Sequence, residues 1–334
     1  MIKTLFTDRL ILREYQETDK EAYFKLKSDK ATMYYLQDIQ LSNQEEADAE
    51  LSNLLSDMRD EHRKFYFLHI ELKDTHEQVG SIGYTVVDET PLGKIVHLGY
   101  FTYPKFWNNG YVTEALKKVL EYAFTENNVY RITTGCLAEN SGSERVMIKC
   151  GFTKEAEHID WEWHDGKMKT RLEYRLLNKE WKKTTDKQKA KQLLSYHSGR
   201  NADINNEKWQ NGFLGSLRPF KGQLIEENFK EVMECIKTLK DELMQNTLGR
   251  DIVSDIVGIV YLSRIWSSPH GMLGSNHLLT QAQTNRLNLW TDIIEGCLMW
   301  LLEGDEKDAF WDYKLYLDGE FEEEITISEI KREK

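Results

Sequence analysis

The first half of the chain alternates between segments with the two-residue repeat of strands and segments with the helical repeat near 3.6 residues. Strand-like runs, rich in β-branched and aromatic residues, are expected at 10–12, 65–72, 79–87, 94–102, 131–137, 152–159 and 168–177. Helical spacing of apolar residues is expected at 19–27, 44–63, 113–124 and 141–150. This alternation predicts an α/β domain with a sheet flanked by helices.

After residue 210 the pattern becomes almost wholly helical. One apolar stripe consists of Phe229, Val232, Met233, Ile236, Leu239 and Leu243, and further helices are expected at 250–266 and 284–302. Three or four such helices would form a bundle. The segment Trp266–His277 between them has two histidines and no triad or metal-ligand spacing, so we expect a helix–helix connection there.

Length and local charge divide the chain. At 334 residues it is longer than one core usually supports. Residues 182–210 hold 7 Lys and Arg against 3 Asp and Glu and are mostly non-periodic. We therefore expect a first domain over 1–181, a basic linker over 182–210, a helical accessory domain over 211–318 and an acidic tail over 319–334.

Composition narrows the class of partner. The whole chain has 44 Lys and Arg against 56 Asp and Glu, a net charge of −12, which disfavours nucleic acid and weakly favours a cationic or amine substrate. Polar residues interrupt the longest apolar run, so neither a membrane span nor a membrane partner is expected. Four widely spaced cysteines favour a reducing, cytoplasmic location and predict no metal site.

The segment Pro104–Ala115 places a turn between a strand and a helix. Turn amides and helix N-terminal amides converge on anions in such places, and Gly110 permits close backbone approach. A diphosphate would fit this turn. An ordinary capped turn is the alternative that the segment alone leaves open.

Four ordered motifs resemble the GNAT acetyltransferases, specifically the RimJ/RimL-type branch, over about residues 3–178. They are Thr7–Arg13, His97–Phe101, Trp107–Thr113, and Asn140–Ser143 with Lys149–Phe152. The resemblance implies the GNAT fold, a mixed, mostly antiparallel sheet flanked by helices, followed here by an all-α domain. It also implies acetyl-CoA as co-substrate and an amine as acceptor, either a protein N-terminus or a small molecule.

By the same resemblance, the acyl-CoA diphosphate is held by the turn residues Trp107, Asn108, Asn109, Gly110, Tyr111, Val112 and Thr113. The strand backbone at Phe101 and Thr102 is expected to pair with the pantetheine arm, and Asn140 to hydrogen-bond it. Val112 departs from the small residue usual there. Methionine occupies position 147, where the wider superfamily often has a proton-donating tyrosine, so the resemblance points to Ser143 as the donor; helix capping is its alternative role.

Acetylation of an amine needs a base that removes the ammonium proton near neutral pH. His97 lies on a predicted strand where relatives often carry Glu, although a structural histidine is the alternative. Asp160, Glu162, His164 and Asp165 are further candidates in the closing strand pair, where Trp161 and Trp163 flank Glu162. We select His97 and Glu162 from these candidate bases and, with Ser143 as the donor, take the three as catalytic candidates.

The sequence also leaves a non-enzymatic interpretation open. Val112, Met147 and Thr170, where relatives often carry Asp, depart from the family pattern. A degenerate CoA-binding sensor with the helical domain as its partner-binding module, or a homodimer formed through that domain, would fit these departures.

Overall fold

A computed structural model describes residues 2–321, which fall into two compact units, Met1–Lys182 and Lys183–Lys334. The boundary between them lies within helix α5 (Asn178–His197). Each unit has its own hydrophobic core, as the length of the chain predicts. No helix among residues 2–321 is both long and apolar enough to cross a lipid bilayer.

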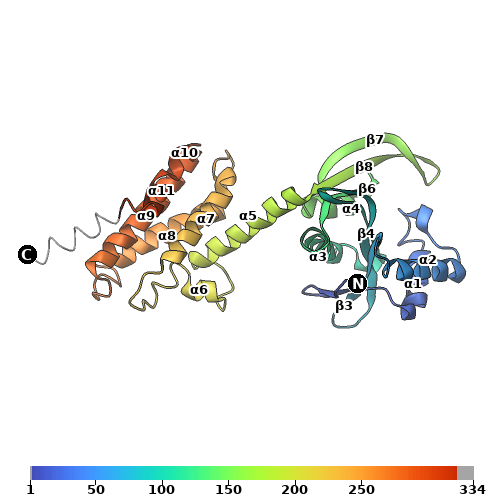
Figure 1. Cartoon of the computed structure of the whole chain (residues 1–334), viewed down its shortest axis with the longest axis horizontal. Coiled ribbons are helices and arrows are strands. Elements are labelled where there is room, and N and C mark those ends of the chain that lie inside the picture. Colours follow the sequence, from blue (N-terminus) through green and yellow to red (C-terminus); the bar gives the residue numbers. More distant parts are fainter. Residues whose placement is uncertain (1, 322–334) are drawn as a thin grey trace, which may run out of the picture. The chain divides into compact units, whose positions relative to one another are not determined.

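The first unit is built on an eight-stranded sheet with the order β1-β2-β3-β4-β5-β6-β8-β7. Figure 1 labels β3, β4, β6, β7 and β8 of this sheet. Only the central pair β5–β6 is parallel; the other neighbours are antiparallel. The strands are β1 (Leu5–Phe6), β2 (Leu10–Glu14), β3 (Phe65–Leu72), β4 (Gln78–Thr90), β5 (Gly93–Thr102), β6 (Val129–Leu137), β7 (Thr153–His164) and β8 (Lys167–Leu177).

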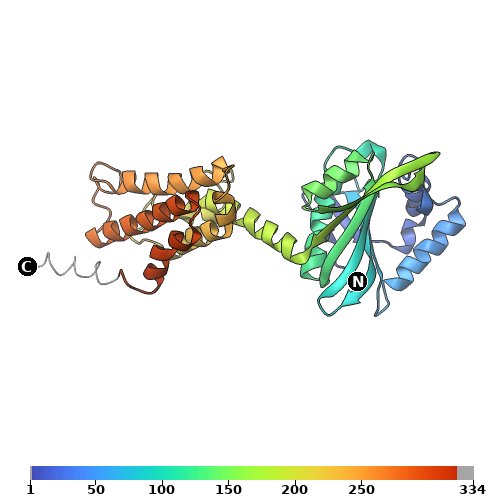
Figure 2. The same ribbon diagram turned by 90° about the horizontal axis from the view of Figure 1, so that it is seen from above.

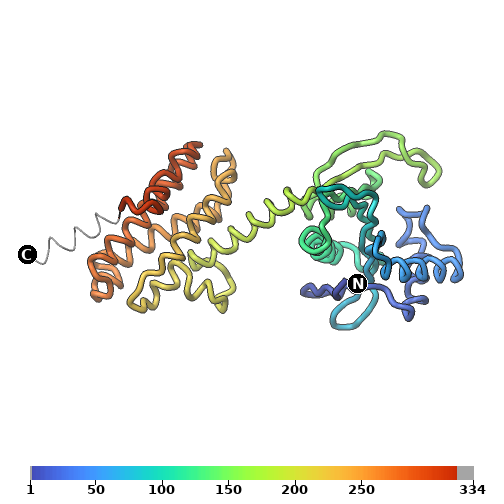
Figure 3. Tube along the Cα trace, viewed as in Figure 1, coloured from blue at the N-terminus to red at the C-terminus, as the bar shows by residue number. Residues whose placement is uncertain are grey.

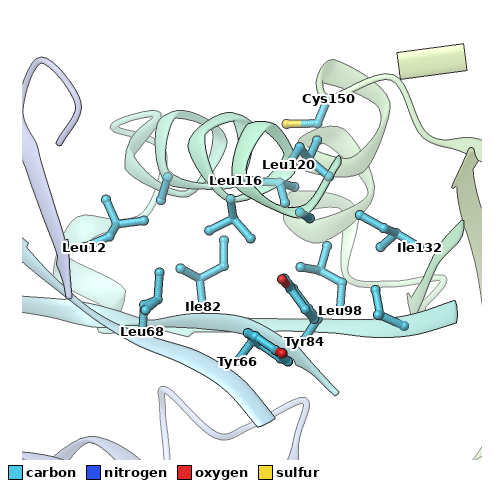
Figure 4. Packing of buried hydrophobic residues seen from close by; sticks show 14 of the residues in the cluster. Leu12, Tyr66, Leu68, Ile82, Tyr84, Leu98, Leu116, Leu120, Ile132 and Cys150 are labelled. Carbon is cyan, nitrogen blue, oxygen red and sulfur yellow. The ribbon is translucent and has the colours of Figure 1, made fainter. Parts of the chain in front are cut away.

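Helices cover both faces of this sheet (Figure 2). Helices α3 (Tyr111–Thr125) and α4 (Ser141–Lys149) pack on one face, where Leu116 and Leu120 meet Ile82, Leu98 and Ile132 (Figure 4). Helices α1 (Lys20–Ser28) and α2 (Gln44–Asp57) form a smaller core on the other face, which Phe67 of β3 joins. Short 3₁₀ helices occur at Glu17–Asp19, Gln37–Ile39 and Pro104–Phe106.

This architecture is the GNAT fold that the sequence predicts. Burial from both sides explains why the central strands are nearly continuous apolar runs, with Val79 through Tyr84 all buried. Side chains with even numbers on β5, such as Val96 and Leu98, point to the α3–α4 face, and His97 points to the other. The sheet therefore has two chemically distinct sides.

The closing hairpin is longer than expected. β7 was predicted to end at residue 159 and instead runs to His164. A bulge allows this: between the pairs His158↔Arg171 and Glu162↔Lys169, β7 has two more residues than β8. Asp160 adopts a left-handed conformation in the bulge (φ 50°). Figure 3 shows the hairpin arching over the side of the sheet that carries α1 and α2.

The second unit is helical. Besides the remainder of α5 it contains α6 (Glu207–Asn211), α7 (Glu226–Leu243), α8 (Arg250–Ser267), α9 (Gln281–Leu302), α10 (Glu306–Ala309) and α11 (Trp311–Leu317). Its core centres on Phe229, whose ring stacks on Trp290 with centroids 5.3 Å apart. The loop Ser268–Thr280, with both histidines of the Trp266–His277 segment, connects α8 to α9.

Residues 182–210, expected to form a linker, contain most of α5. Its lysines have a structural use, since Lys191 pairs with Glu242 and Lys187 with Asp241, both on α7. Leu194 and His197 of the same helix are fully buried. Residues 322–334 of the expected acidic tail lie outside the described residues.

Candidate active site

The sheet opens between its two central strands. Parallel pairing of β5 with β6 ends at His97↔Thr133, and the Thr134 hydroxyl donates to the Leu98 carbonyl just beyond (3.1 Å). From there β5 continues with β4 as far as Thr102, while β6 continues with β8 as far as Leu137. The two strands therefore diverge. We call the space between Gly99–Thr102 and Gly135–Leu137 the interstrand gap.

The backbone of Tyr100 faces this gap. The carbonyls of Val96 and Leu98 accept hydrogen bonds from β6 side chains, so even-numbered residues of β5 direct their polar groups toward β6. Tyr100 keeps that orientation by alternation, whereas Phe101 turns its backbone toward β4. The Thr102 carbonyl is already used, because it accepts from the Trp107 indole (3.0 Å).

At one end of the gap, the turn after β5 presents a row of amides. No protein acceptor among residues 2–321 is hydrogen-bonded to the backbone N–H of any residue from Asn108 to Thr113. Gly110 caps α3 in a left-handed conformation (φ 78°). The arrangement leaves several aligned donors at a helix N-terminus, which is the geometry that binds phosphate groups. Val112 is half-buried in the first turn and its amide is among these donors.

Arg9 and Glu114 stabilise this turn through hydrogen bonds. The Glu114 carboxylate accepts from the Thr7 hydroxyl (2.5 Å) and from the backbone and Nε of Arg9 (2.9 and 2.7 Å). Although burial opposes ionisation, these hydrogen bonds hold the pKa of Glu114 below its usual value. Arg9 in turn donates to the Asn109 carbonyl (3.1 Å) and lies over the Tyr111 ring. Glu114 is thus committed to holding this turn in place.

Helix α4 begins beside the gap. Asn140 is its N-cap, with Oδ1 accepting from the Ser143 amide (3.1 Å). Ser143 is therefore free of the capping role. Its hydroxyl is 2.8 Å from the Tyr100 hydroxyl, which reaches it from β5. Met147 lies one turn further along and is fully buried in the core.

His97 occupies the other face of the sheet, at the point where the strands separate. Its Nδ1 is 3.2 Å from the Thr133 hydroxyl, which itself donates to the Val96 carbonyl. Thr133 therefore accepts from Nδ1–H, and Nε2 carries the free lone pair. Partial burial lowers the pKa of His97, Arg171 lowers it further and Glu173 opposes both. The imidazole is accordingly neutral at pH 7.

Glu162 lies on the same face, held by an arginine. Arg171 donates to Glu162 (2.8 Å) and to Glu173 (2.6 Å), so one guanidinium bridges two carboxylates. Gly135 of β6 makes room for this bridge, because a Cβ there would meet Glu173 Oε2 at 2.8 Å and Arg171 Nη2 at 3.0 Å. The three charged side chains form a network beside the gap, which we call the Arg171 bridge.

The tip of hairpin β7–β8 packs against residues 34 and 35 on this face. His164 is buried between Tyr34 and Tyr35, with ring centroids 4.9 and 5.9 Å away, and the Tyr34 hydroxyl reaches Asp165 (3.3 Å). Trp161 and Trp163 lie on the hairpin with 62% and 69% of their surface exposed. Strand alternation turns Trp163 to the side opposite Glu162, and the Trp161 ring lies 4.7 Å from the ring of His158.

The candidates from the sequence thus gather around the gap, on two sides. The turn 107–113, Asn140 and Ser143 lie on the α3–α4 side, and His97 with Glu162 lies on the other. The side chains of Tyr100, Arg171 and Glu173 are not among the residues predicted from the sequence. The spacing of Arg171 and Glu173 along one strand was a usable signal, since residues two apart share a face.

Known proteins resemble this chain over about half its length. A model of the family described as acetyltransferase (GNAT) domain matches residues 9–153. The uncharacterized N-acetyltransferases YoaA and YnaD of Bacillus subtilis (strain 168) are each 31% identical to it; the matches cover 50% and 52% of this chain and 92% and 97% of those proteins. A solved GNAT-family acetyltransferase from Bacillus anthracis is 25% identical, with a TM-score of 0.45, over 53% of this chain and 100% of its own.

Proposed function

Because the chain belongs to the GNAT family of N-acetyltransferases, we propose that it transfers acetyl from acetyl-CoA to a primary amine by direct attack in a ternary complex. The single observation that carries this proposal is the interstrand gap, with free turn amides at one end and the Ser143 and His97 side chains on opposite faces. The coenzyme would enter from the α3–α4 side and the amine from the other.

The turn Trp107–Thr113 would hold the diphosphate through the unpaired amides of residues 108–113, with Gly110 allowing the close approach. Arg9 fixes the shape of that turn through the Asn109 carbonyl. The pantetheine arm would pair with β5 along the gap. Tyr100 supports this role better than Phe101, because its backbone is the one turned toward the gap; Thr102 and Asn140 would contribute at either end.

On the acceptor side, His97 is proposed as the base. Its Nε2 lone pair is free, and its lowered pKa keeps it neutral when the substrate is an ammonium ion. The amine nitrogen then attacks the thioester carbon, and the C–S bond breaks with its electron pair on sulfur. Ser143 donates a hydrogen bond to that sulfur from the other face, and the second proton that the attacking nitrogen loses neutralises the thiolate, so the serine keeps its own proton.

Glu162 is the second candidate base. Its carboxylate is engaged by Arg171, so it would accept a proton only after that ion pair loosens. A cationic acceptor could loosen it by competing with the guanidinium for the two carboxylates. The proposed acceptor is therefore a primary amine with positive charge, either a protein N-terminus or a small cationic amine.

The proposal is tested by titrating the full chain with acetyl-CoA in a calorimeter and then measuring thiol release with peptides, polyamines and aminoglycosides. Binding with turnover supports the enzyme and identifies the acceptor class. Absence of binding would refute the assignment of the turn amides. His97→Ala and Ser143→Ala should each lower turnover and leave acetyl-CoA affinity nearly unchanged, and exposed His62→Ala is the matched control.

One observation favours a second function, a CoA sensor with a partner-binding helical unit. Val257, Tyr261 and Ile265 lie one turn apart on α8 with 49%, 60% and 42% of their surface exposed, an apolar stripe of the kind that binds partners. CoA binding without turnover of any amine, together with loss of a partner on Tyr261→Glu, would favour this alternative. We also propose that this stripe could form a homodimer. The domain limits 1–181 and 211–318 and a cytoplasmic location are proposed as well.

A further inference from the structure

The side chain of Tyr100 links the sheet to helix α4 at the interstrand gap. It leaves β5 on the α3–α4 face and is half-buried. Its hydroxyl lies 2.8 Å from Ser143 Oγ and 3.2 Å from the Ser143 carbonyl. Both partners therefore belong to one residue, in the first turn of α4.

The hydrogens of this contact can be arranged in two ways: the phenol donates to Ser143 Oγ, or it donates to the Ser143 carbonyl and accepts from Oγ. Burial raises the pKa of Tyr100, so the hydroxyl keeps its proton throughout the physiological range. Its single hydrogen can be given only to Ser143, because both neighbouring oxygens are on that residue. When Tyr100 donates to Ser143 Oγ, the serine hydroxyl must direct its own hydrogen elsewhere.

A contact with β6 places the start of the same helix at the other border of the gap. The Cys136 thiol donates to the carbonyl of Asn140, the N-cap of α4 (3.9 Å). Cys136 belongs to β6, on the far side of the gap from Tyr100. The start of α4, which holds Ser143, is thus in contact with both strands that border the gap.

We propose that Tyr100 is a positioning residue for the leaving group: by donating to Ser143 Oγ, it aims the serine hydrogen at the sulfur of CoA. This inference rests on the proposed function, in which Ser143 is the donor. As the C–S bond breaks, its electron pair passes to sulfur, and the proton lost by the attacking amine balances the charge. Tyr100 itself touches neither substrate through its hydroxyl and loses no proton.

The test uses CoA itself and needs no acceptor. The full chain is saturated with CoA, and the ultraviolet absorbance of the thiolate is followed against pH, with the desulfo-CoA complex as the blank. A hydrogen bond to sulfur stabilises the thiolate and lowers the pKa of the bound thiol. We expect Ser143→Ala to raise that pKa by about one unit, a tenfold change in the ionisation constant.

Tyr100→Phe keeps the ring and the backbone and should raise the thiol pKa nearly as much as Ser143→Ala. The double variant should match Ser143→Ala alone, because both changes remove the same hydrogen bond. Tyr84→Phe is the matched control: Tyr84 is also a buried tyrosine of this sheet, and its hydroxyl accepts from Asn127 (2.7 Å) away from the gap.

The outcomes separate this inference from the function beneath it. A Tyr100→Phe titration equal to wild type, or a double variant showing the sum of two shifts, would overturn the inference and leave Ser143 as donor. An unchanged titration in Ser143→Ala would overturn the assignment of Ser143 and the inference with it. Failure of CoA to bind at all would refute both through the proposed function.

Discussion

Replacement of His97 by alanine tests the acceptor side of the site most directly. A general base typically contributes about 10²- to 10⁴-fold to the rate, equivalent to about 3–5 kcal/mol in the barrier. The His97 ring reaches the surface, so water can partly replace it as proton acceptor. We therefore expect the lower end of that range, about a hundredfold loss of kcat.

The pH profile identifies the group. A base must be deprotonated, so kcat/KM rises with pH through the pKa of His97, which burial and Arg171 place below 6.5. His97→Ala should remove this limb. Arg171→Gln should move it to higher pH, because it removes a charge that lowers the pKa and leaves Glu173 to raise it.

The assay measures thiol release with the best amine of the panel between pH 5 and pH 9. This interval covers about the range where an imidazole titrates. Acetyl-CoA affinity by calorimetry controls for folding of the site. A His97→Ala variant within threefold of wild type, with the same acid limb, would refute the reasoning and transfer the role to Glu162.

Three further predictions concern the two units. Gly110→Ala should weaken acetyl-CoA binding about 5- to 30-fold in calorimetry, since a left-handed alanine costs about 1–2 kcal/mol. The control is Gly199→Ala, which changes another left-handed glycine (φ 69°) and should leave the affinity unchanged. Equal affinities for the two variants would contradict the phosphate role of the turn. Glu114→Ala should destabilise the first unit by about 1–3 kcal/mol at pH 7, through lost charged hydrogen bonds. Because the pKa of Glu114 is lowered, that difference in thermal melts should disappear as pH falls through the folded-state pKa, and a difference that persists in acid would refute it. Trp290→Ala should destabilise the second unit by about 3–5 kcal/mol in calorimetric unfolding and leave acetyl-CoA affinity intact; a parallel loss of affinity would show that the units are coupled.

The order of strands and helices in the first unit could be predicted because local patterns determine it. The run 65–72 is found as β3 with the expected limits, and 141–150 differs from α4 by one residue. The extension of β7 to His164 could not be predicted in this way. It depends on a bulge that restores pairing with β8, and Asp160 gives only a weak local sign of it.

Residue types and family likeness predict roles for the turn 107–113 and for Ser143, but they do not predict the pairing among side chains. Arg171 and Glu162 are nine residues apart on opposite strands of a bulged hairpin, so their contact depends on a register that the sequence leaves open. The same holds for α5. The sequence of α5 is rich in charged residues and shows almost no apolar periodicity. Its place in the second unit follows from its ion pair with α7 and from the burial of Leu194.

Met147 shows why a departure from a family pattern needs the fold before it can be judged. Taken alone, methionine on α4 means that a proton donor is missing. In the structure Met147 is core, and a phenol reaches the first turn of the same helix from β5 instead, through Tyr100 and Ser143. The loss of a tyrosine on the helix is therefore not a loss of hydroxyl hydrogen bonding at the gap. For this reason the departure at position 147 does not by itself argue for a degenerate enzyme, and the titration of bound CoA is the measurement that weighs it.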